Sequence, residues 1–309
     1  MTLHGWIILD KPVGLGSTTA VSAVKRILRQ AGEPKTKVGH GGALDPLASG
    51  VLPIALGEAT KLCGRMLGAT KSYSFTINFG EETDTLDAEG KLVATSDARP
   101  TRRDVEAVLA QFTGEIEQVP PAYSAVKIGG KAAYARARAG EVVEIRPRIV
   151  AILSLRVTVP PREPNPTRSR EGAETLSEVT LAAEVSKGTY IRSLARDIAL
   201  ALNTVGHVTM LRRTRAGPFS LEQAISLDFL EEAAKARRLT RTVLPLQAAL
   251  DDIPALPVTP DQARLLRHGQ MLFGIPAKPG LSLATSEGTP VALVEAAADG
   301  LKVVRGFNL

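Results

Sequence analysis

The chain has 309 residues, of which 44% are hydrophobic and 23% charged, and these values exclude disorder over most of its length. A single cysteine and four histidines exclude an internal disulfide and argue against a zinc site. No apolar run approaches about 18 residues, and the N-terminus lacks the basic region of a signal peptide, so we expect a cytoplasmic protein that does not enter the membrane.

The charge is unevenly distributed along the chain. The net charge is +6 with an isoelectric point near 9.5. Residues 251–309 carry five bases and six acids, so the first 250 residues hold the whole positive excess. A basic excess favours a polyanionic partner such as nucleic acid.

Hydrophobic periodicity predicts the elements of the first half in chain order. Residues 5–10 are expected to form a buried strand, after which Ser17 caps a helix with apolar positions at helical spacing. A glycine-rich loop follows, then a strand over 51–56, a helix over 58–67 and a half-buried strand over 73–79. Thr101 is expected to cap a helix that runs to Phe112.

The second half continues with strand and bend over 141–159, a strand over 176–186 and a helix over 190–202. Because strands and helices do not alternate regularly, we expect the α+β class with a central, mostly antiparallel sheet flanked by helices. Residues 160–175 are rich in Pro, Arg, Ser and Glu and are interpreted as an exposed insertion.

Prolines cluster between Pro245 and Pro260, where the charge character also changes. We therefore expect a large domain over 1–248 and a small β-rich domain over 249–309. The small domain is expected to contain a helix near 262–267 and short strands at 281–284, 291–296 and 301–304.

The loop Gly39-His40-Gly41-Gly42-Ala43-Leu44-Asp45-Pro46-Leu47-Ala48-Ser49-Gly50 carries the strongest functional pattern. Its glycines allow close backbone approach to a ligand, and Pro46 restricts the conformation of Asp45. The loop therefore presents a single carboxylate. As a pattern alone, an ordinary Asp-Pro turn beside a glycine cluster is the more frequent explanation.

This loop resembles the signature of the TruB-type tRNA pseudouridine synthases. Further motifs of that family occur in the same order: LDKP at 9–12, KSY at 71–73, TDTLD at 83–87, PAYSAVK at 121–127, SKGTYIR at 186–192 and HVTMLRR at 207–213. The resemblance implies the pseudouridine synthase fold with a C-terminal PUA-like domain. It also implies isomerisation of the T-loop uridine at position 55 of tRNA, after base flipping, without cofactor or metal.

The resemblance also assigns roles to individual residues. It makes Asp45 the catalytic carboxylate, and Arg192 its cationic partner. Tyr73 is implied to stack on the uracil, although it could instead end a row of core side chains on its strand. Tyr190 and Leu211 are implied to line the uracil pocket, Leu211 having a core position as its alternative, and His40 to stack into the T-loop.

Asp87 is implied to hold the active-site network, with a turn cap as its alternative. Lys11 and Pro12, Lys127, Arg212 and Arg213 are assigned to substrate binding; the four cations are candidates for phosphate contacts that could also be solvated charges. Residues 123–140 resemble the mobile RNA-binding thumb of the family. The expected partner is the T-arm and elbow of tRNA, bound by a monomer that requires no protein partner.

Two alternatives stay open. One is a guide-RNA-dependent synthase subunit, although the large basic tail typical of such relatives is missing from this sequence. The other is a tRNA-folding chaperone that acts by binding alone, which would not need the Asp45 carboxylate.

Overall fold

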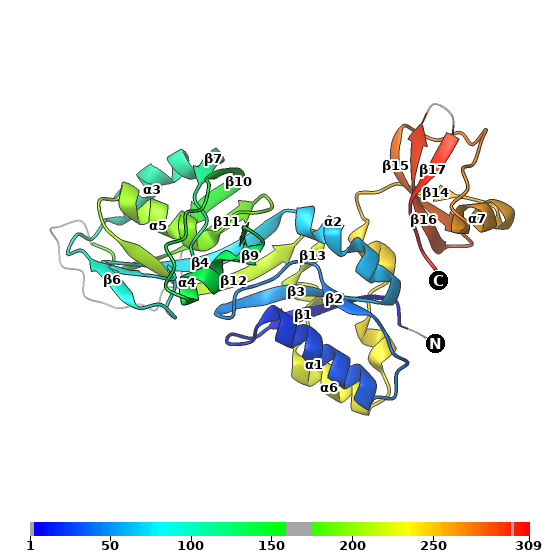
Figure 1. Ribbon diagram of the computed structural model, residues 1–309, viewed down its shortest axis with the longest axis horizontal. Helices are drawn as coiled ribbons and strands as arrows, with labels where there is room; N and C mark the ends of the chain where they lie inside the picture. Colours follow the sequence, from blue (N-terminus) through cyan, green and yellow to red (C-terminus); the bar gives the residue numbers. More distant parts are fainter. Residues whose placement is uncertain (1–2, 159–174, 298–299) are drawn as a thin grey trace, which may run out of the picture. The chain divides into compact units, whose positions relative to one another are not determined.

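The computed structural model describes residues 3–158, 175–297 and 300–309, which form two compact units (Figure 1). The first unit comprises Met1–Asp45, Gly50–Leu67 and Ala216–Leu309, and the second comprises Pro46–Ser49 and Gly68–Arg215. The expected insertion at 160–175 lies, except for Thr175, outside the described residues.

The first unit begins with an antiparallel arrangement of three strands. Both β1 (Gly5–Lys11) and β2 (Val38–His40) pair with β3 (Ala48–Leu56), and the pairing of Gly5 with Leu56 sets the register of β1. Helix α1 (Ser17–Gln30) connects β1 to β2 and packs beside α6 (Leu227–Lys235) (Figure 1). Its buried Ala20, Val24 and Ile27 recur at helical spacing, which explains why this segment forms an amphipathic helix.

The region expected as one helix over 58–67 is instead a 3₁₀ helix, Gly57–Leu62, followed by the short helix α2 (Cys63–Gly68). The first unit also contains β13 (Phe219–Ser220) and the 3₁₀ helices Leu221–Gln223, Leu239–Thr242 and Leu246–Ala249. The only tryptophan of the chain, Trp6, is fully buried on β1, and its indole N–H donates to the Leu246 carbonyl oxygen at 3.1 Å.

The second unit is built on strands in the order β12-β4-β11-β10-β7. They are β4 (Lys71–Phe79), β7 (Gly114–Gln118), β10 (Arg148–Val157), β11 (Glu178–Val185) and β12 (Gly206–Ala216). β11 is antiparallel to β4 and to β10, and β10 is antiparallel to β7. The alternation of residues along β4 and β11 places Phe75, Ile77, Leu181 and Ala183 in one core.

Two helices supply the other half of this core, α3 (Arg102–Val108) and α5 (Ile191–Ala201). Thr101 caps α3 as expected, in a reciprocal capping box with Asp104. The unit is completed by the 3₁₀ helix Leu109–Phe112 and by two hairpins, β5 (Glu81–Thr83) with β6 (Leu92–Thr95) and β8 (Lys127–Ile128) with β9 (Lys131–Ala132), the second leading into α4 (Ala133–Arg138).

The C-terminal part of the first unit has a four-stranded sheet of its own, in the order β14-β15-β16-β17. Its strands are β14 (Ala255–Pro257), β15 (Gly280–Ser286), β16 (Thr289–Ala297) and β17 (Gly300–Gly306), and α7 (Pro260–Arg267) packs against them. The expected helix and three strands of this region are all present. The division of the chain at residues 248 and 249 stays a prediction, whereas the α+β class is confirmed.

None of the helices in the described ranges is long and apolar enough to cross a membrane.

Candidate active site

Asp45 lies in the loop between β2 and β3 and is half-buried. The loop packs closely against its own unit: the Gly41 N–H donates to the Pro53 carbonyl oxygen at 2.8 Å, and a Cβ atom at Gly41 would lie only 2.8 Å from Met66 Cβ. Gly42 adopts a positive φ of 140°, which side chains rarely allow. The glycines at 41 and 42 are therefore required by the path of the chain itself.

Leu44, immediately before Asp45, is held by Ser17. The Ser17 hydroxyl donates to the Leu44 carbonyl oxygen at 2.8 Å and accepts from the Leu44 N–H at 2.7 Å, and both residues are buried. The prediction that Ser17 caps α1 is wrong. Gly16 occupies the N-cap position without a side-chain bond, and Ser17 is the first helical residue.

Lys11 is fully buried at the end of β1. Its ammonium group donates to the carbonyl oxygens of Pro12 at 2.9 Å and Leu15 at 2.6 Å, which fixes the turn between β1 and α1. This contradicts the expectation that Lys11 contacts phosphate, because its charge is not presented to solvent. Pro12 itself is exposed.

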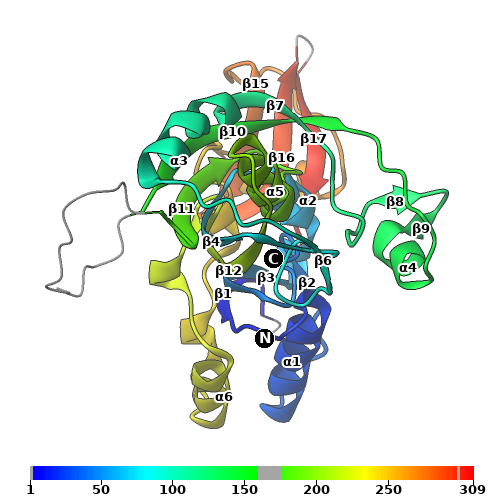
Figure 2. The same ribbon diagram turned by 90° about the vertical axis from the view of Figure 1, so that its left-hand side faces the viewer.

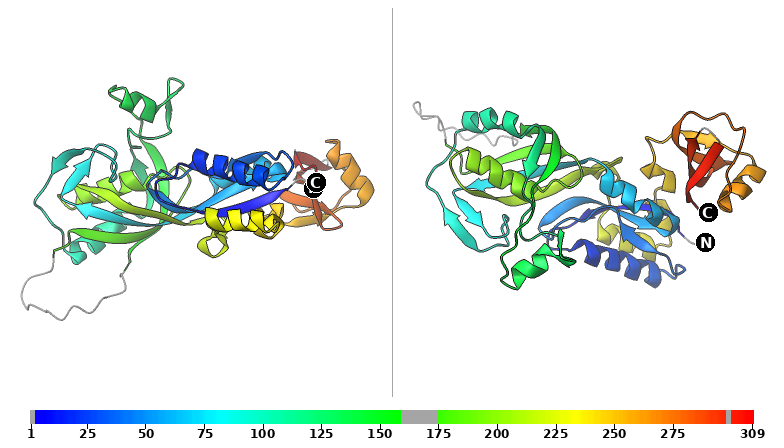
Figure 3. Two further views of the ribbon diagram at one scale, coloured as in Figure 1. Left: turned by 90° about the horizontal axis from the view of Figure 1, so that it is seen from below. Right: turned by 45° about the horizontal axis from the view of Figure 1, so that its top comes forward.

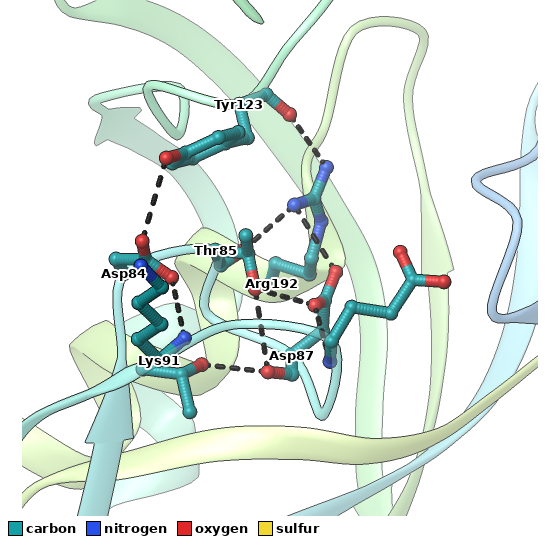
Figure 4. A network of polar contacts seen from close by, with 8 residues as sticks. Asp84, Thr85, Asp87, Lys91, Tyr123 and Arg192 are labelled. Carbon is teal, nitrogen blue, oxygen red and sulfur yellow. Dashed lines mark hydrogen bonds and ion pairs between the residues drawn. The ribbon is translucent and has the colours of Figure 1, made fainter. Parts of the chain in front are cut away.

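Arg192, in the first turn of α5, is at the centre of a buried network in the second unit (Figure 4). Its Nη1 lies 3.2 Å from Asp87 Oδ2 and donates to the Thr85 carbonyl oxygen at 2.7 Å, while Nη2 donates to the Tyr123 carbonyl oxygen at 3.0 Å. The side chains of Arg192 and Asp87 are only 6% and 8% exposed. Water screens such a buried pair weakly, so the loss of either charge would leave the other buried and uncompensated.

Asp87 is oriented by its own turn. Its Oδ1 accepts from the Thr85 hydroxyl at 2.5 Å and from the Glu89 N–H at 3.1 Å, and its carbonyl oxygen accepts from the Thr83 hydroxyl at 2.6 Å. Leu86 has a positive φ of 61°, an unfavourable conformation for leucine that the surrounding bonds maintain. The structure thus brings Asp87 and Arg192 together, and Asp87 is more than a turn cap.

Two further contacts extend this network (Figure 4). Asp84 accepts from the Lys91 N–H at 2.8 Å and from the Tyr123 hydroxyl at 3.4 Å. Tyr123 therefore makes two hydrogen bonds to the network, one through its carbonyl oxygen and one through its phenol. It belongs to the PAYSAVK motif, and this contact ties the start of residues 123–140 to the turn that holds Asp87.

Tyr190 is the N-cap residue of α5, and its backbone is held by Gln118 at the end of β7. The Gln118 amide accepts from the Tyr190 N–H at 2.8 Å and donates to the Tyr190 carbonyl oxygen at 3.1 Å. The Arg148 guanidinium lies 4.7 Å from the centre of the Tyr190 ring, a cation–π distance. The backbone and the ring are thus both restrained.

Tyr73 on β4 and Leu211 on β12 are half-buried and pack against the core of the second unit. Tyr73 is paired in register with Ala183 of β11. Arg212 is half-buried, and its Nη1 donates to the Ser49 hydroxyl at 3.3 Å.

Arg213 is 1% exposed, which contradicts its expected role as a surface contact for phosphate. Burial, followed by the nearby Arg213 guanidinium, lowers the pKa of Lys71 to about 8.

His40 ends β2, is half-buried, and its Nδ1 accepts from the Gly42 N–H at 3.4 Å. Lys127 is exposed on β8. Residues 127–138, which form β8, β9 and α4, stand out from the sheet of the second unit (Figures 2 and 3). The Lys127 side chain is thus presented to solvent on a projecting segment.

Sequence reasoning missed three residues that hold the candidate site. Thr85 and Tyr123 lay inside quoted motifs, where motif membership was the only available signal. Gln118 lay in no motif, and no pattern pointed to it. No group of three His, Cys, Asp or Glu side chains within residues 3–158, 175–297 and 300–309 is placed to hold a metal ion.

Two family models match the chain. Residues 25–191 match the N-terminal domain of the TruB family pseudouridylate synthases, and residues 192–251 match the tRNA pseudouridylate synthase B C-terminal domain. A protein of Novosphingobium aromaticivorans named tRNA pseudouridine synthase B is 59% identical, over 99% of this chain and 98% of its own length. The protein of that name from Zymomonas mobilis is 58% identical, over 99% and 96%.

Solved structures show the same fold. A structure of an H/ACA RNP bound to a substrate RNA containing 2′-deoxyuridine matches with a TM-score of 0.71 and 26% identity, over 99% of this chain and 86% of that chain. A Cbf5-Nop10-Gar1 complex matches with a TM-score of 0.69 and 29% identity, over 98% and 84%.

The fold and these similarities define an enzyme of the pseudouridine synthase class. The chain belongs to the TruB family, whose members isomerise uridine in RNA to pseudouridine.

Proposed function

We propose that this enzyme converts the T-loop uridine at position 55 of tRNA to pseudouridine. The observation that carries the proposal is the Asp45 loop. It presents one carboxylate on a glycine-rich connection, and the residue before Asp45 is fixed through both of its backbone polar groups. Relatives that cover nearly the whole chain at 59% and 58% identity bear the name tRNA pseudouridine synthase B.

The reaction is a rearrangement of bonds within a single nucleotide. The glycosidic bond between ribose C1′ and uracil N1 breaks, a bond between C1′ and C5 forms, C5 loses its proton and N1 gains one. The target base has to leave the folded tRNA loop to reach a catalytic group. Because no atom is gained or lost overall, the reaction is complete without a co-substrate.

We assign Asp45 as the catalytic carboxylate, since a carboxylate is already ionised at neutral pH and needs no base to activate it. Arg192 is proposed as its cationic partner, because a guanidinium favours the ionised form of a carboxylate. In this proposal Asp87, Thr85 and the Tyr123 carbonyl hold the guanidinium in place, as their contacts with Arg192 allow.

Tyr73, Tyr190 and Leu211 are proposed to surround the uracil, and His40 to contact the T-loop. Lys127 and Arg212 remain the candidates for phosphate contacts among the assigned cations. Residues 123–140 are proposed to order on the RNA, supported by their projection from the second unit (Figure 2). We also propose the division into a catalytic domain over 1–248 and a PUA-like domain over 249–309, which the separate sheet β14–β17 supports.

We propose stand-alone action by a monomer. The structural neighbours include complexes with partner proteins, but at 26% and 29% identity they are more distant than the relatives named tRNA pseudouridine synthase B. A chaperone that only binds tRNA would not need the carboxylate of Asp45.

The test is to incubate the purified protein with an unmodified tRNA transcript, without cofactor, guide RNA or other protein, and to map modified uridines. Pseudouridine at position 55 alone is the expected result. Stoichiometric binding without any modification would favour the chaperone, and modification only after addition of a guide RNA would favour the other alternative.

A further inference from the structure

A groove of about 920 Å³ lies between the C-terminal half of α1 and residues 33–38. Leu28 and Val38, both buried, contribute apolar surface to it. Four exposed cations stand around it: Lys25, Arg29, Lys35 and Lys37. The one acidic residue of its lining is Glu33, so the groove has a clear positive excess.

These four cations form no ion pair within the part of the chain that the structure describes. Arg26 on the same helix, by contrast, pairs with Glu231 of α6 at 3.2 Å. One side of α1 is thus neutralised and the groove side is not. Neighbouring like charges repel each other, and an anion in the groove would remove that repulsion.

The groove is continuous in the chain with the Asp45 loop. Val38 lines the groove and begins β2, and His40 ends β2 only two residues later, about 7 Å away along an extended strand. An RNA that presents a nucleotide to this loop extends for many phosphates on either side of it, and these are the anions that match the groove.

We propose that this groove binds the phosphodiester backbone of the tRNA substrate away from the target nucleotide. The proposal rests on the proposed function. It predicts that the groove contributes to affinity and to its salt dependence, since each neutralised phosphate contributes about 0.9 to the slope of log affinity against log salt.

The test replaces all four groove cations together, as Lys25→Gln, Arg29→Gln, Lys35→Gln and Lys37→Gln, and measures affinity for unmodified tRNA across a salt series. The slope should fall by about 2–4, and at low salt Kd and KM should rise at least ten-fold, more than kcat falls. A matched variant removes four exposed cations elsewhere in the same unit: Lys235→Gln, Arg237→Gln, Arg238→Gln and Arg241→Gln.

The matched variant should show less than half of the slope change of the groove variant and keep at least half of the wild-type affinity, because its residues lie outside the groove. An equal loss in both variants would overturn the proposal, as would an unchanged slope in the groove variant. Inactivity of the wild-type protein on tRNA would instead refute the proposed function. If the groove variant loses salt slope with tRNA but keeps the wild-type slope with an isolated T-arm stem-loop, the phosphates that contact the groove lie outside the T-arm.

A second observation concerns Ser17, whose hydroxyl binds both backbone polar groups of Leu44. We infer that Ser17 is a positioning residue for Asp45, again on the basis of the proposed function. The two bonds fix the peptide next to the carboxylate from a helix 27 residues earlier in the chain. Misplacement of a catalytic group by about 1 Å can cost on the order of 100-fold in rate.

Ser17→Ala removes both bonds, and single-turnover isomerisation should slow by about ten-fold or more while tRNA affinity changes less than about three-fold. Hydrogen exchange at the Leu44 amide should become faster. Ser17→Thr, which keeps the hydroxyl, should recover most of the rate. Ser22→Ala is the matched control, because the Ser22 hydroxyl on α1 donates to the Thr18 carbonyl oxygen of its own helix at 3.1 Å, in an exposed position.

An unchanged rate in Ser17→Ala, with wild-type protein active, would refute the positioning role and leave the proposed function intact. A slower rate accompanied by an equal loss of tRNA affinity would indicate general damage to the fold, and would refute it as well.

Discussion

The buried pair of Asp87 and Arg192 allows a quantitative prediction. Asp87→Asn removes the anion and leaves the guanidinium buried beside the carbonyl oxygens of Thr85 and Tyr123. Removing one partner of a buried pair typically costs about 3–5 kcal/mol. Because asparagine keeps an oxygen that accepts a hydrogen bond, and because two carbonyl oxygens remain, we expect a smaller loss of about 2–3 kcal/mol.

Calorimetry is the appropriate assay, since the one tryptophan lies in the first unit and would not report on the second. A loss of about 2–3 kcal/mol corresponds to a decrease in Tm of roughly 4–12 °C for a unit of this size. The control is Glu106→Gln, which breaks the exposed pair with Arg102 and should cost less than about 0.5 kcal/mol. Equal Tm values for Asp87→Asn and wild type would refute the reasoning.

Three more predictions concern buried polar groups. Lys71 has a folded-state pKa near 8, below its unfolded value of about 10.4, so the unfolded state binds more protons between these values and stability rises with pH there. The wild-type protein should therefore gain about 1–2 kcal/mol of unfolding free energy relative to Lys71→Met when the pH is raised from about 7.5 to about 10. A difference between the two proteins that does not change with pH would contradict the burial of the Lys71 charge. Gln118→Leu removes both hydrogen bonds to the Tyr190 backbone and should lower the free energy of unfolding, measured by urea denaturation, by about 2–3 kcal/mol. A loss below about 0.5 kcal/mol would show that these two bonds are dispensable. Lys11→Met should lower Tm but leave the salt slope of tRNA binding unchanged, and the reverse pattern would restore Lys11 as a phosphate contact.

Local patterns predicted most of the secondary structure. Alternating residues along β4 and β11 reflect a sheet with one buried face, and the Thr101 capping box depends on residues only three apart. The region after β3 was predicted less well, because its apolar spacing fits an α helix, whereas the chain first forms a 3₁₀ turn at Gly57–Leu62. Whether a short segment takes one form or the other depends on packing that no local pattern records.

Motifs can nominate residues of a candidate site, but they do not predict the contacts between them. The motifs pointed to Asp45, Asp87 and Arg192, but the bond from Arg192 to the Thr85 carbonyl spans 107 residues. The motif around Lys11 predicts a phosphate contact, whereas in the fold the Lys11 ammonium group binds two carbonyl oxygens and holds a turn. Cations that end in the interior cannot be distinguished from surface cations by sequence alone.

We propose that the Asp45 carboxylate performs the chemistry. The most direct measurement compares wild type and Asp45→Asn for tritium release from tRNA labelled at uridine C5, with tRNA affinity measured in parallel. We predict no detectable release by Asp45→Asn and a Kd within a few-fold of wild type, because the proposed role of the carboxylate is in the reaction of the target nucleotide and not in binding phosphates. Release at the wild-type rate by Asp45→Asn would contradict the account.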